Sequence, residues 1–139
     1  MTTDATDALD AHRRRNLDAV LGAFAGIAAG DADRQLAHYT DDLVIDLPYS
    51  SPPKRLEGRE AARAFLAGAL QVFELHLTVD EVHPGLDPDE MVLEFSGTGT
   101  HRETGAPYTN RYVGIFAFRD GRIRFQREYY DTSAIPGRT

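Results

Sequence analysis

The chain has 139 residues, enough for one domain with a sizeable core, because a domain of about 150 residues buries about 70% of its unfolded surface. Its formal net charge of −7 argues against a nucleic-acid partner, and the absence of cysteine excludes disulfides and thiolate catalysis. The longest small-apolar run, 19–29, is far shorter than the ~20 residues of a membrane span, and the N-terminus has no apolar signal segment. We therefore expect a cytoplasmic protein with no membrane partner.

The first half of the chain carries helix signals. Residues 1–10 read as a flexible tail, and residues 11–29 have apolar side chains at the i, i+3, i+4, i+7 spacing of an amphipathic helix. Gly30 fits the end of that helix, and Asp31 can cap a short helix through about residue 39. A strand over 43–47 and a proline-rich loop over 48–56 then precede a third helix that begins near residue 57.

The second half carries strand signals. Strands are expected over 75–82, 91–100, 108–119 and 122–131, separated by a turn at 84–88 and a loop at 101–107. Helices followed by a run of strands predict an α+β domain, with the helices packed on one face of a curved, mostly antiparallel sheet. The space between helices and sheet would form a cone able to hold a small molecule.

The last two strands form the most informative segment. Asp120-Gly121 between alternating runs is a strong β-hairpin signal. In the second run Gln126, Glu128 and Tyr130 share one face, because side chains alternate along a strand. Folding does not require a carboxylate there, so the pattern favours a polar pocket.

Several short sequence motifs, in this order, resemble those of the NTF2-like superfamily, in particular its SnoaL-like, ketosteroid-isomerase-like branch. They are Ala29-Gly30-Asp31, Tyr39-Thr40-Asp41-Asp42, Leu56-Glu57-Gly58-Arg59-Glu60 and Phe118-Arg119-Asp120-Gly121-Arg122-Ile123, followed by Glu128-Tyr129. The resemblance implies a cone-shaped fold with three N-terminal helices, a single domain over 11–131 and a C-terminal tail over 132–139. It also implies a homodimer through the open face of the sheet, and enzymes or binding proteins that use no metal or cofactor.

Two catalytic sets of this superfamily are not retained. The ketosteroid isomerase positions for the base, the oxyanion-hole acid and the helix tyrosine fall at Leu47, near Gly114 and near Ala23. Asp46, one residue before the base position, should face the other side of its strand, pointing outward or pairing with Arg59. The inward residues of strand 108–119 also lack the Arg and Asp set of limonene epoxide hydrolases.

A third comparison is more favourable. Phenazine-biosynthesis proteins of this fold end in a similar Arg-Glu-aromatic word, in which the glutamate serves as acid/base. Here that word is Arg127-Glu128-Tyr129, so the resemblance carries this role to Glu128. The alternative is a structural carboxylate paired with Arg111 or Arg124.

Further residues complete the predicted site. His76 and Tyr39 are candidates for a second polar group beside Glu128, although a half-exposed strand histidine is the commoner case and a tyrosine packed in the core is at least as ordinary. The remaining candidates would bind the substrate, and they are Asn110, Tyr112, Gln126, Tyr130, Phe65, Phe116 and Ile27. The five histidines show no metal-ligand spacing, and no phosphate-binding glycine loop or nucleophile elbow is present.

The sequence thus favours a cofactor-independent enzyme that acts on a small apolar or aromatic metabolite in a biosynthetic pathway. Isomerisation, cyclisation or dehydration by general acid/base chemistry would fit. A non-catalytic binding or assembly module is the alternative. A second alternative, an epoxide hydrolase, needs Glu128 and Asp46 in one cavity.

Overall fold

The structure of the protein, a computed structural model, describes residues 2–135, with side chains from residue 5 onward. Helices and strands follow in the order α1 (Thr2–Ala28), α2 (Ala32–Leu36), β1 (Tyr39–Leu47), β2 (Lys54–Glu57), α3 (Arg59–Val72), β3 (Phe73–Pro84), β4 (Glu90–His101), β5 (Pro107–Arg119) and β6 (Arg122–Tyr130). A short 3₁₀ helix, Thr132–Ala134, follows β6. Among the described residues, no helix is both long and apolar enough to cross a membrane.

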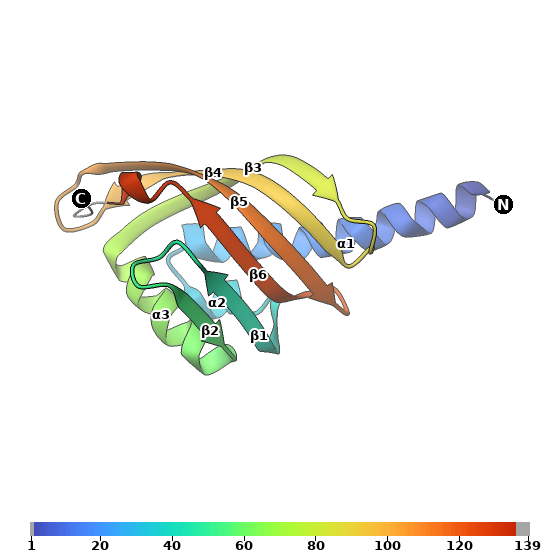
Figure 1. Cartoon of the computed structure of the whole chain (residues 1–139), viewed down its shortest axis with the longest axis horizontal. Coiled ribbons are helices and arrows are strands. Elements are labelled where there is room, and N and C mark those ends of the chain that lie inside the picture. Colours follow the sequence, from blue (N-terminus) through green and yellow to red (C-terminus); the bar gives the residue numbers. More distant parts are fainter. Residues whose placement is uncertain (1, 136–139) are drawn as a thin grey trace.

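All six strands form one curved sheet in the order β2-β1-β6-β5-β4-β3. Neighbouring strands are antiparallel except for β1 and β6, which pair in parallel. Figure 1 shows α1 running along one face of the sheet, with α2 and α3 near the β1 end. The predicted α+β class and the mostly antiparallel, curved sheet are confirmed.

The core lies between the helices and this face of the sheet. Side chains of β5 alternate between exposed and buried, as expected for a strand with one covered face. Phe24 of α1 packs on Phe95 of β4, with ring centroids 5.1 Å apart. Alternation along the strands therefore decides which residues can reach the interior.

The predicted hairpin is present. Asp120 and Gly121 form its two-residue loop, both with positive φ, 52° and 76°. This backbone matches the twist of antiparallel strands and explains the Asp-Gly pair. β6 begins at Arg122, and after a β-bulge near Arg124 its residues Gln126 and Glu128 point toward the helices.

Other boundaries differ from the sequence-based prediction. α1 begins at Thr2 and not at residue 11, because residues 2–10 continue the helix without the apolar periodicity that signals one. Their turns project beyond the body of the molecule in Figure 1. At the other end of the chain, residues 136–139 of the predicted tail lie outside the described residues.

The segment 48–56, predicted as a loop, contains the start of β2. Its residues pair antiparallel with β1, with Leu56 opposite Ile45 and Lys54 opposite Leu47. Pro52 and Pro53 lie just before this edge strand. They are typical of a loop and so hid a strand that is only four residues long. α3 therefore follows two strands, and it starts at Arg59.

Candidate active site

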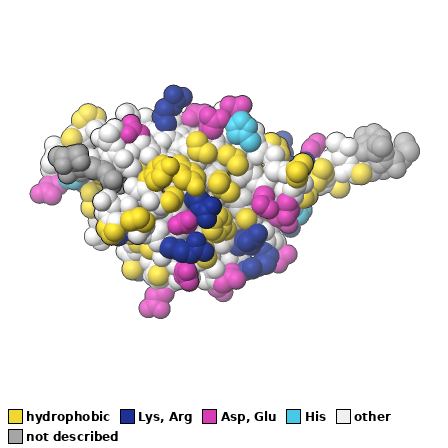
Figure 2. Space-filling model, in the orientation of Figure 1, with side chains coloured by type: hydrophobic (Ala, Val, Ile, Leu, Met, Phe, Trp, Pro, Cys, Tyr) yellow, Lys and Arg dark blue, Asp and Glu magenta, His cyan; other side chains and the backbone are white. Residues whose placement is uncertain are grey.

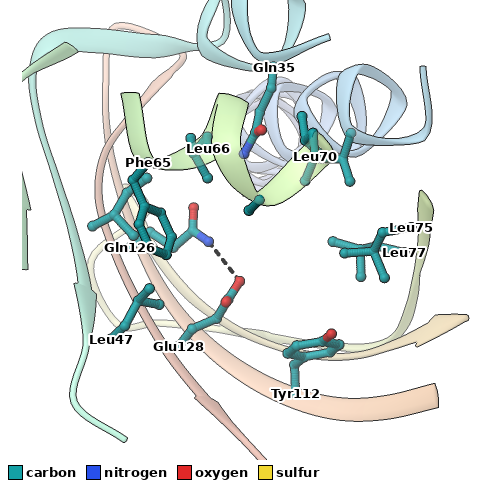
Figure 3. A pocket seen from close by; sticks show the side chains of 13 residues that line it. Gln35, Leu47, Phe65, Leu66, Leu70, Leu75, Leu77, Tyr112, Gln126 and Glu128 are labelled. Atoms are coloured by element: carbon teal, nitrogen blue, oxygen red, sulfur yellow. Dashed lines mark hydrogen bonds between the residues drawn. The ribbon is translucent and has the colours of Figure 1, made fainter. Parts of the chain in front are cut away.

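A cavity of about 160 Å³ lies between the three helices and the sheet. Nine of its lining side chains are hydrocarbon: Ile27, Ile45, Leu47, Phe65, Leu66, Ala69, Leu70, Leu75 and Leu77. Four are polar, namely Gln35 from α2, Tyr112 from β5, and Gln126 and Glu128 from β6. Figure 3 shows these side chains converging on one space below α3. A mostly apolar cavity with a few convergent polar groups is typical of a small-molecule site.

Glu128 is the carboxylate of this cavity. Its Oε1 accepts a hydrogen bond of 2.8 Å from Gln126 Nε2, drawn in Figure 3. Burial raises the pKa of Glu128 to about 7, and the bond from Gln126 opposes that rise. The side chain remains half-buried because part of its surface borders the cavity. Near neutral pH it can therefore either accept or donate a proton.

No ion pair involves Glu128 within residues 5–135. Arg111 and Arg124, its predicted alternative partners, are both exposed. Arg111 faces outward because odd and even residues of β5 face opposite ways, and a β-bulge at Arg124 turns that even-numbered residue outward too, so the sheet separates both arginines from the cavity-facing Glu128. The salt-bridged alternative therefore finds no support in the structure.

Tyr39 supports the site from behind. It is fully enclosed at the start of β1, and its hydroxyl donates to Gln126 Oε1 at 2.5 Å. Burial raises the pKa of Tyr39, and the negative charge of Glu128 raises it further. Tyr39 does not line the cavity, so it orients Gln126, which in turn orients Glu128. It was predicted as a catalytic group, and the structure places it outside the cavity wall, bonded to Gln126.

A second network holds Tyr112. Its hydroxyl lies 2.7 Å from that of Tyr108, which also accepts a bond of 2.9 Å from Asn110 Nδ2. The same Asn110 amide bonds the main chain of Asp131 at 2.9 and 3.1 Å. Asn110 was predicted to bind substrate, but it is outside the cavity wall and fixes the end of β6 to β5.

Of the other residues predicted to bind substrate, some line the cavity and some do not. Phe65 and Ile27 line the cavity as predicted. Phe116 is buried in the core without reaching the cavity. Tyr130 packs against Tyr112, with ring centroids 6.1 Å apart, and borders a hollow on the other side of the sheet.

His76 is not part of this site. Its side chain is exposed on the outer face of β3, where it bonds Glu74 at 3.1 Å. Its inward neighbours Leu75 and Leu77 line the cavity instead. The prediction that His76 supplies a second polar group is wrong, because the phase of β3 turns it outward.

Asp46 faces away from the cavity, as the strand phase predicts, while Leu47 lines it. The predicted partner of Asp46 was Arg59, but Asp46 accepts from Arg127 Nε at 2.8 Å. Arg59 instead holds Asp41 at 3.1 Å. The pairing follows from β1 and β6 being adjacent strands, a parallel contact that sequence alone did not reveal.

A group of potential metal ligands lies elsewhere. Glu81, His83 and Glu94 place one ligand atom each within 4.8 Å of one another on the outer side of β3 and β4. All three are exposed, and His83 already bonds Glu94 at 2.7 Å. This hydrogen bond accounts for the grouping without an ion, because exposed acidic groups often gather in this way.

The sequence profile of the SnoaL-like domain matches residues 20–126. The chain is also similar to the uncharacterised protein YesE of Bacillus subtilis, with 30% identity over 100 residues that cover 70% of this chain and 68% of YesE.

Crystal structures with the same fold include three informative ones. A proposed isomerase from Bacillus subtilis has a TM-score of 0.82 and 24% identity, covering 89% of this chain and 91% of its own. A phenazine biosynthesis-related protein from Pseudomonas aeruginosa has a TM-score of 0.75 and 19% identity, covering 93% and 87%. A Mycobacterium tuberculosis protein in complex with estradiol-17β-hemisuccinate has a TM-score of 0.74 and 23% identity, covering 86% and 96%. At these identities the likeness concerns the fold.

Proposed function

Because this chain belongs to the SnoaL-like domain family, we propose that it is a cofactor-independent enzyme that acts on a small apolar or aromatic metabolite by general acid/base chemistry. The observation that carries the proposal is the position of Glu128, a carboxyl group inside an apolar cavity with which no cation of residues 5–135 forms an ion pair. Isomerisation, cyclisation and dehydration all require such a group, because each moves a proton to or from carbon or oxygen.

Glu128 would move the proton. With a pKa near the working pH, a comparable share of molecules holds the carboxylate and the acid, which suits a group that accepts a proton and returns it. Gln126 fixes one carboxyl oxygen and leaves the other for the substrate. Tyr112 would contribute a hydroxyl at the cavity wall. The hydrocarbon lining would exclude water and keep the pKa of Glu128 high.

The cavity volume limits the substrate. An apolar cavity of about 150 Å³ binds benzene, so about 160 Å³ fits roughly one six-membered ring. Estradiol hemisuccinate, the ligand of the Mycobacterium tuberculosis relative, shows that a protein of this fold holds apolar rings. We infer a smaller substrate here, with one ring and a carbonyl or hydroxyl group.

The test is isotope exchange in heavy water. Small cyclic ketones and phenolic ketones are incubated with the protein, and deuterium uptake beside the carbonyl is followed by NMR. Glu128→Gln should lower the exchange rate by about 10² to 10⁴, the usual contribution of one general base. Glu103→Gln, an exposed carboxylate in the loop before β5, serves as the matched control and should keep the full rate. Full exchange in Glu128→Gln would refute the assignment.

A binding protein without chemistry is the second candidate. It is favoured by one observation, that the cavity of the described chain offers a single carboxylate and no second acid or base of similar pKa. Such a protein would bind ring compounds equally well in both Glu128 forms and catalyse no exchange. The epoxide hydrolase alternative is not supported, because Asp46 pairs with Arg127 away from the cavity.

A cytoplasmic homodimer completes the proposal. The outer face of the sheet carries an apolar group formed by Tyr49, Val113 and Tyr129, with Tyr49 and Val113 56% and 40% exposed. Figure 2 shows hydrophobic side chains gathered near the middle of this face. A second copy would cover them and leave both cavities on the opposite sides of the two sheets.

A further inference from the structure

Lys54 is the only lysine of the chain, and it lies at the start of the edge strand β2. In the pairing of β2 with β1 it is opposite Leu47, and Leu56 is opposite Ile45. Opposite residues of an antiparallel pair share one face of the sheet, and both Ile45 and Leu47 line the cavity. The side chain of Lys54 therefore starts on the cavity face of the sheet, just beyond the cavity wall.

The ammonium group of Lys54 has no ion pair and no hydrogen bond in the part of the chain whose side chains the structure describes. Its Nζ lies over the ring of Phe65, 5.6 Å from the ring centroid, and Phe65 lines the cavity. An aromatic ring attracts a cation but offers no lone pair to its three N–H donors. The next residue, Arg55, faces the other side of β2 and lies 3.2 Å from Glu57 and 3.9 Å from Asp46. Lys54 is thus a half-buried cation whose donors are available to an anion from outside the chain.

Lys54 and Glu128 lie in one row across three strands. Asp46 of β1 pairs with Arg127 of β6, so the next residues of these parallel strands, Leu47 and Glu128, are also neighbours. Lys54 continues the row on the other side of Leu47. Neighbouring strands are about 4.8 Å apart, so the backbones of Lys54 and Glu128 are separated by about 10 Å. One small molecule can therefore reach both residues.

The surface between these two residues is hydrocarbon. It includes Leu47, which is opposite Lys54, and Phe65, whose ring contacts the lysine. Figure 3 shows both side chains on one side of the cavity. A substrate that spans this row would place its ring against Leu47 and Phe65 and a charged group at Lys54. Because the chain has a net charge of −7, an anionic substrate needs such a local cation to be held.

We propose that Lys54 is a specificity-determining residue, and that its ammonium group binds a carboxylate attached to the ring of the substrate. The inference rests on the proposed function, since it takes the cavity as the substrate site. It narrows the substrate class to single-ring carboxylic acids. Their reacting atom would lie at Glu128, and their carboxylate would extend past Phe65 to accept charge-assisted hydrogen bonds from Lys54.

The test compares benzoate with nitrobenzene, which have nearly the same shape and differ in charge. Dissociation constants of both are measured by NMR titration for the wild type, Lys54→Met and Arg55→Met. The two variants each remove one positive charge from β2, but from opposite faces of the strand. The ratio of benzoate affinity to nitrobenzene affinity should fall at least about tenfold in Lys54→Met, because a hydrogen bond between charged groups is lost. In Arg55→Met the ratio should stay near the wild-type value.

The outcomes separate this inference from the enzymatic one. An unchanged ratio in Lys54→Met, an equal fall in both variants, or no binding of benzoate to the wild type overturns the role of Lys54. The deuterium-exchange test of Glu128 is independent of all three results, because it uses uncharged ketones.

If Lys54→Met fails to fold, the wild type with isotope-labelled lysine decides. The sole lysine gives a single side-chain Cε signal in the NMR spectrum. That signal should shift strongly with benzoate and little with nitrobenzene, and equal shifts would overturn the proposal.

Discussion

At the scale of single residues, Glu128 should make the stability of the fold depend on pH. Its pKa is about 7 in the folded protein and near 4.5 in the unfolded chain, so the folded state binds more protons between these values. Stability contributed by the protonated form is therefore full below about pH 4.5 and is lost as the pH rises toward 7. At 1.36 kcal/mol per pKa unit the loss is about 3 kcal/mol.

Glu128→Gln, which stays neutral, should escape this loss. Its free energy of unfolding relative to the wild type should rise by up to about 3 kcal/mol between about pH 5 and about pH 8, measured by urea titration. Glu103→Gln should show no such trend, since that side chain is exposed. A constant difference between Glu128→Gln and the wild type would show that the carboxyl group titrates normally.

Period-two alternation explains why Glu128 could be predicted and Gln35 could not. A charged residue on the buried face of a strand stands out, and the alternation from Gln126 to Tyr130 includes Glu128, although a β-bulge near Arg124 shifts the register before it. Gln35 lies on a five-residue helix, which is too short to show a periodic pattern of apolar residues. A buried glutamine there does not stand out in the sequence. Its place in the cavity wall depends on how closely α2 approaches α1, which only the assembled structure shows. Asn110 was misassigned because sequence cannot tell a lining amide from one that bonds the main chain.

At the scale of secondary-structure elements, the contact between α1 and α2 depends on Gly26. Gly26→Ala should destabilise the fold by about 1–3 kcal/mol, because the new methyl group meets the backbone of Gln35 at 2.4 Å and α2 must move. Gly68→Ala in α3 is the matched control, since nothing lies within 4 Å of its added Cβ. That change should stabilise by about 0.5–1 kcal/mol through helix propensity.

Urea unfolding of both glycine variants checks this expectation. Equal stabilisation by the two changes would mean that α2 does not pack closely on α1.

The strands of the second half were predicted well because each alternates over many residues between clear turn signals. β1 was predicted to start at residue 43 and starts at Tyr39, since residues 41 and 42 are aspartates that hide the alternation. Its parallel pairing with β6 joins segments about 80 residues apart, and no local pattern encodes this. That pairing is what places Tyr39 beside Gln126 and so completes the site.

At the scale of the whole molecule, the outer face of the sheet is the surface on which assembly should depend. Val113 lies opposite Tyr129 on β6 and opposite Glu94 on β4, so the apolar group has a polar border. An apolar centre with a polar rim is the usual anatomy of a protein interface. A stable dimer needs about 800 Å² from each partner, which a face of four long strands can supply.

Val113→Lys should therefore convert the proposed dimer to a monomer. A lysine at the centre of the interface would be buried without a partner on the other copy, which costs several kcal/mol. Val72→Lys is the control, because Val72 is 43% exposed at the end of α3, away from this face, and Val113 is 40% exposed. Light scattering of the wild type and of Val72→Lys should give twice the 15.4 kDa of one chain, and Val113→Lys should give a single chain. A wild-type mass of one chain at every concentration would refute the dimer, and equal effects of the two lysines would place the interface elsewhere.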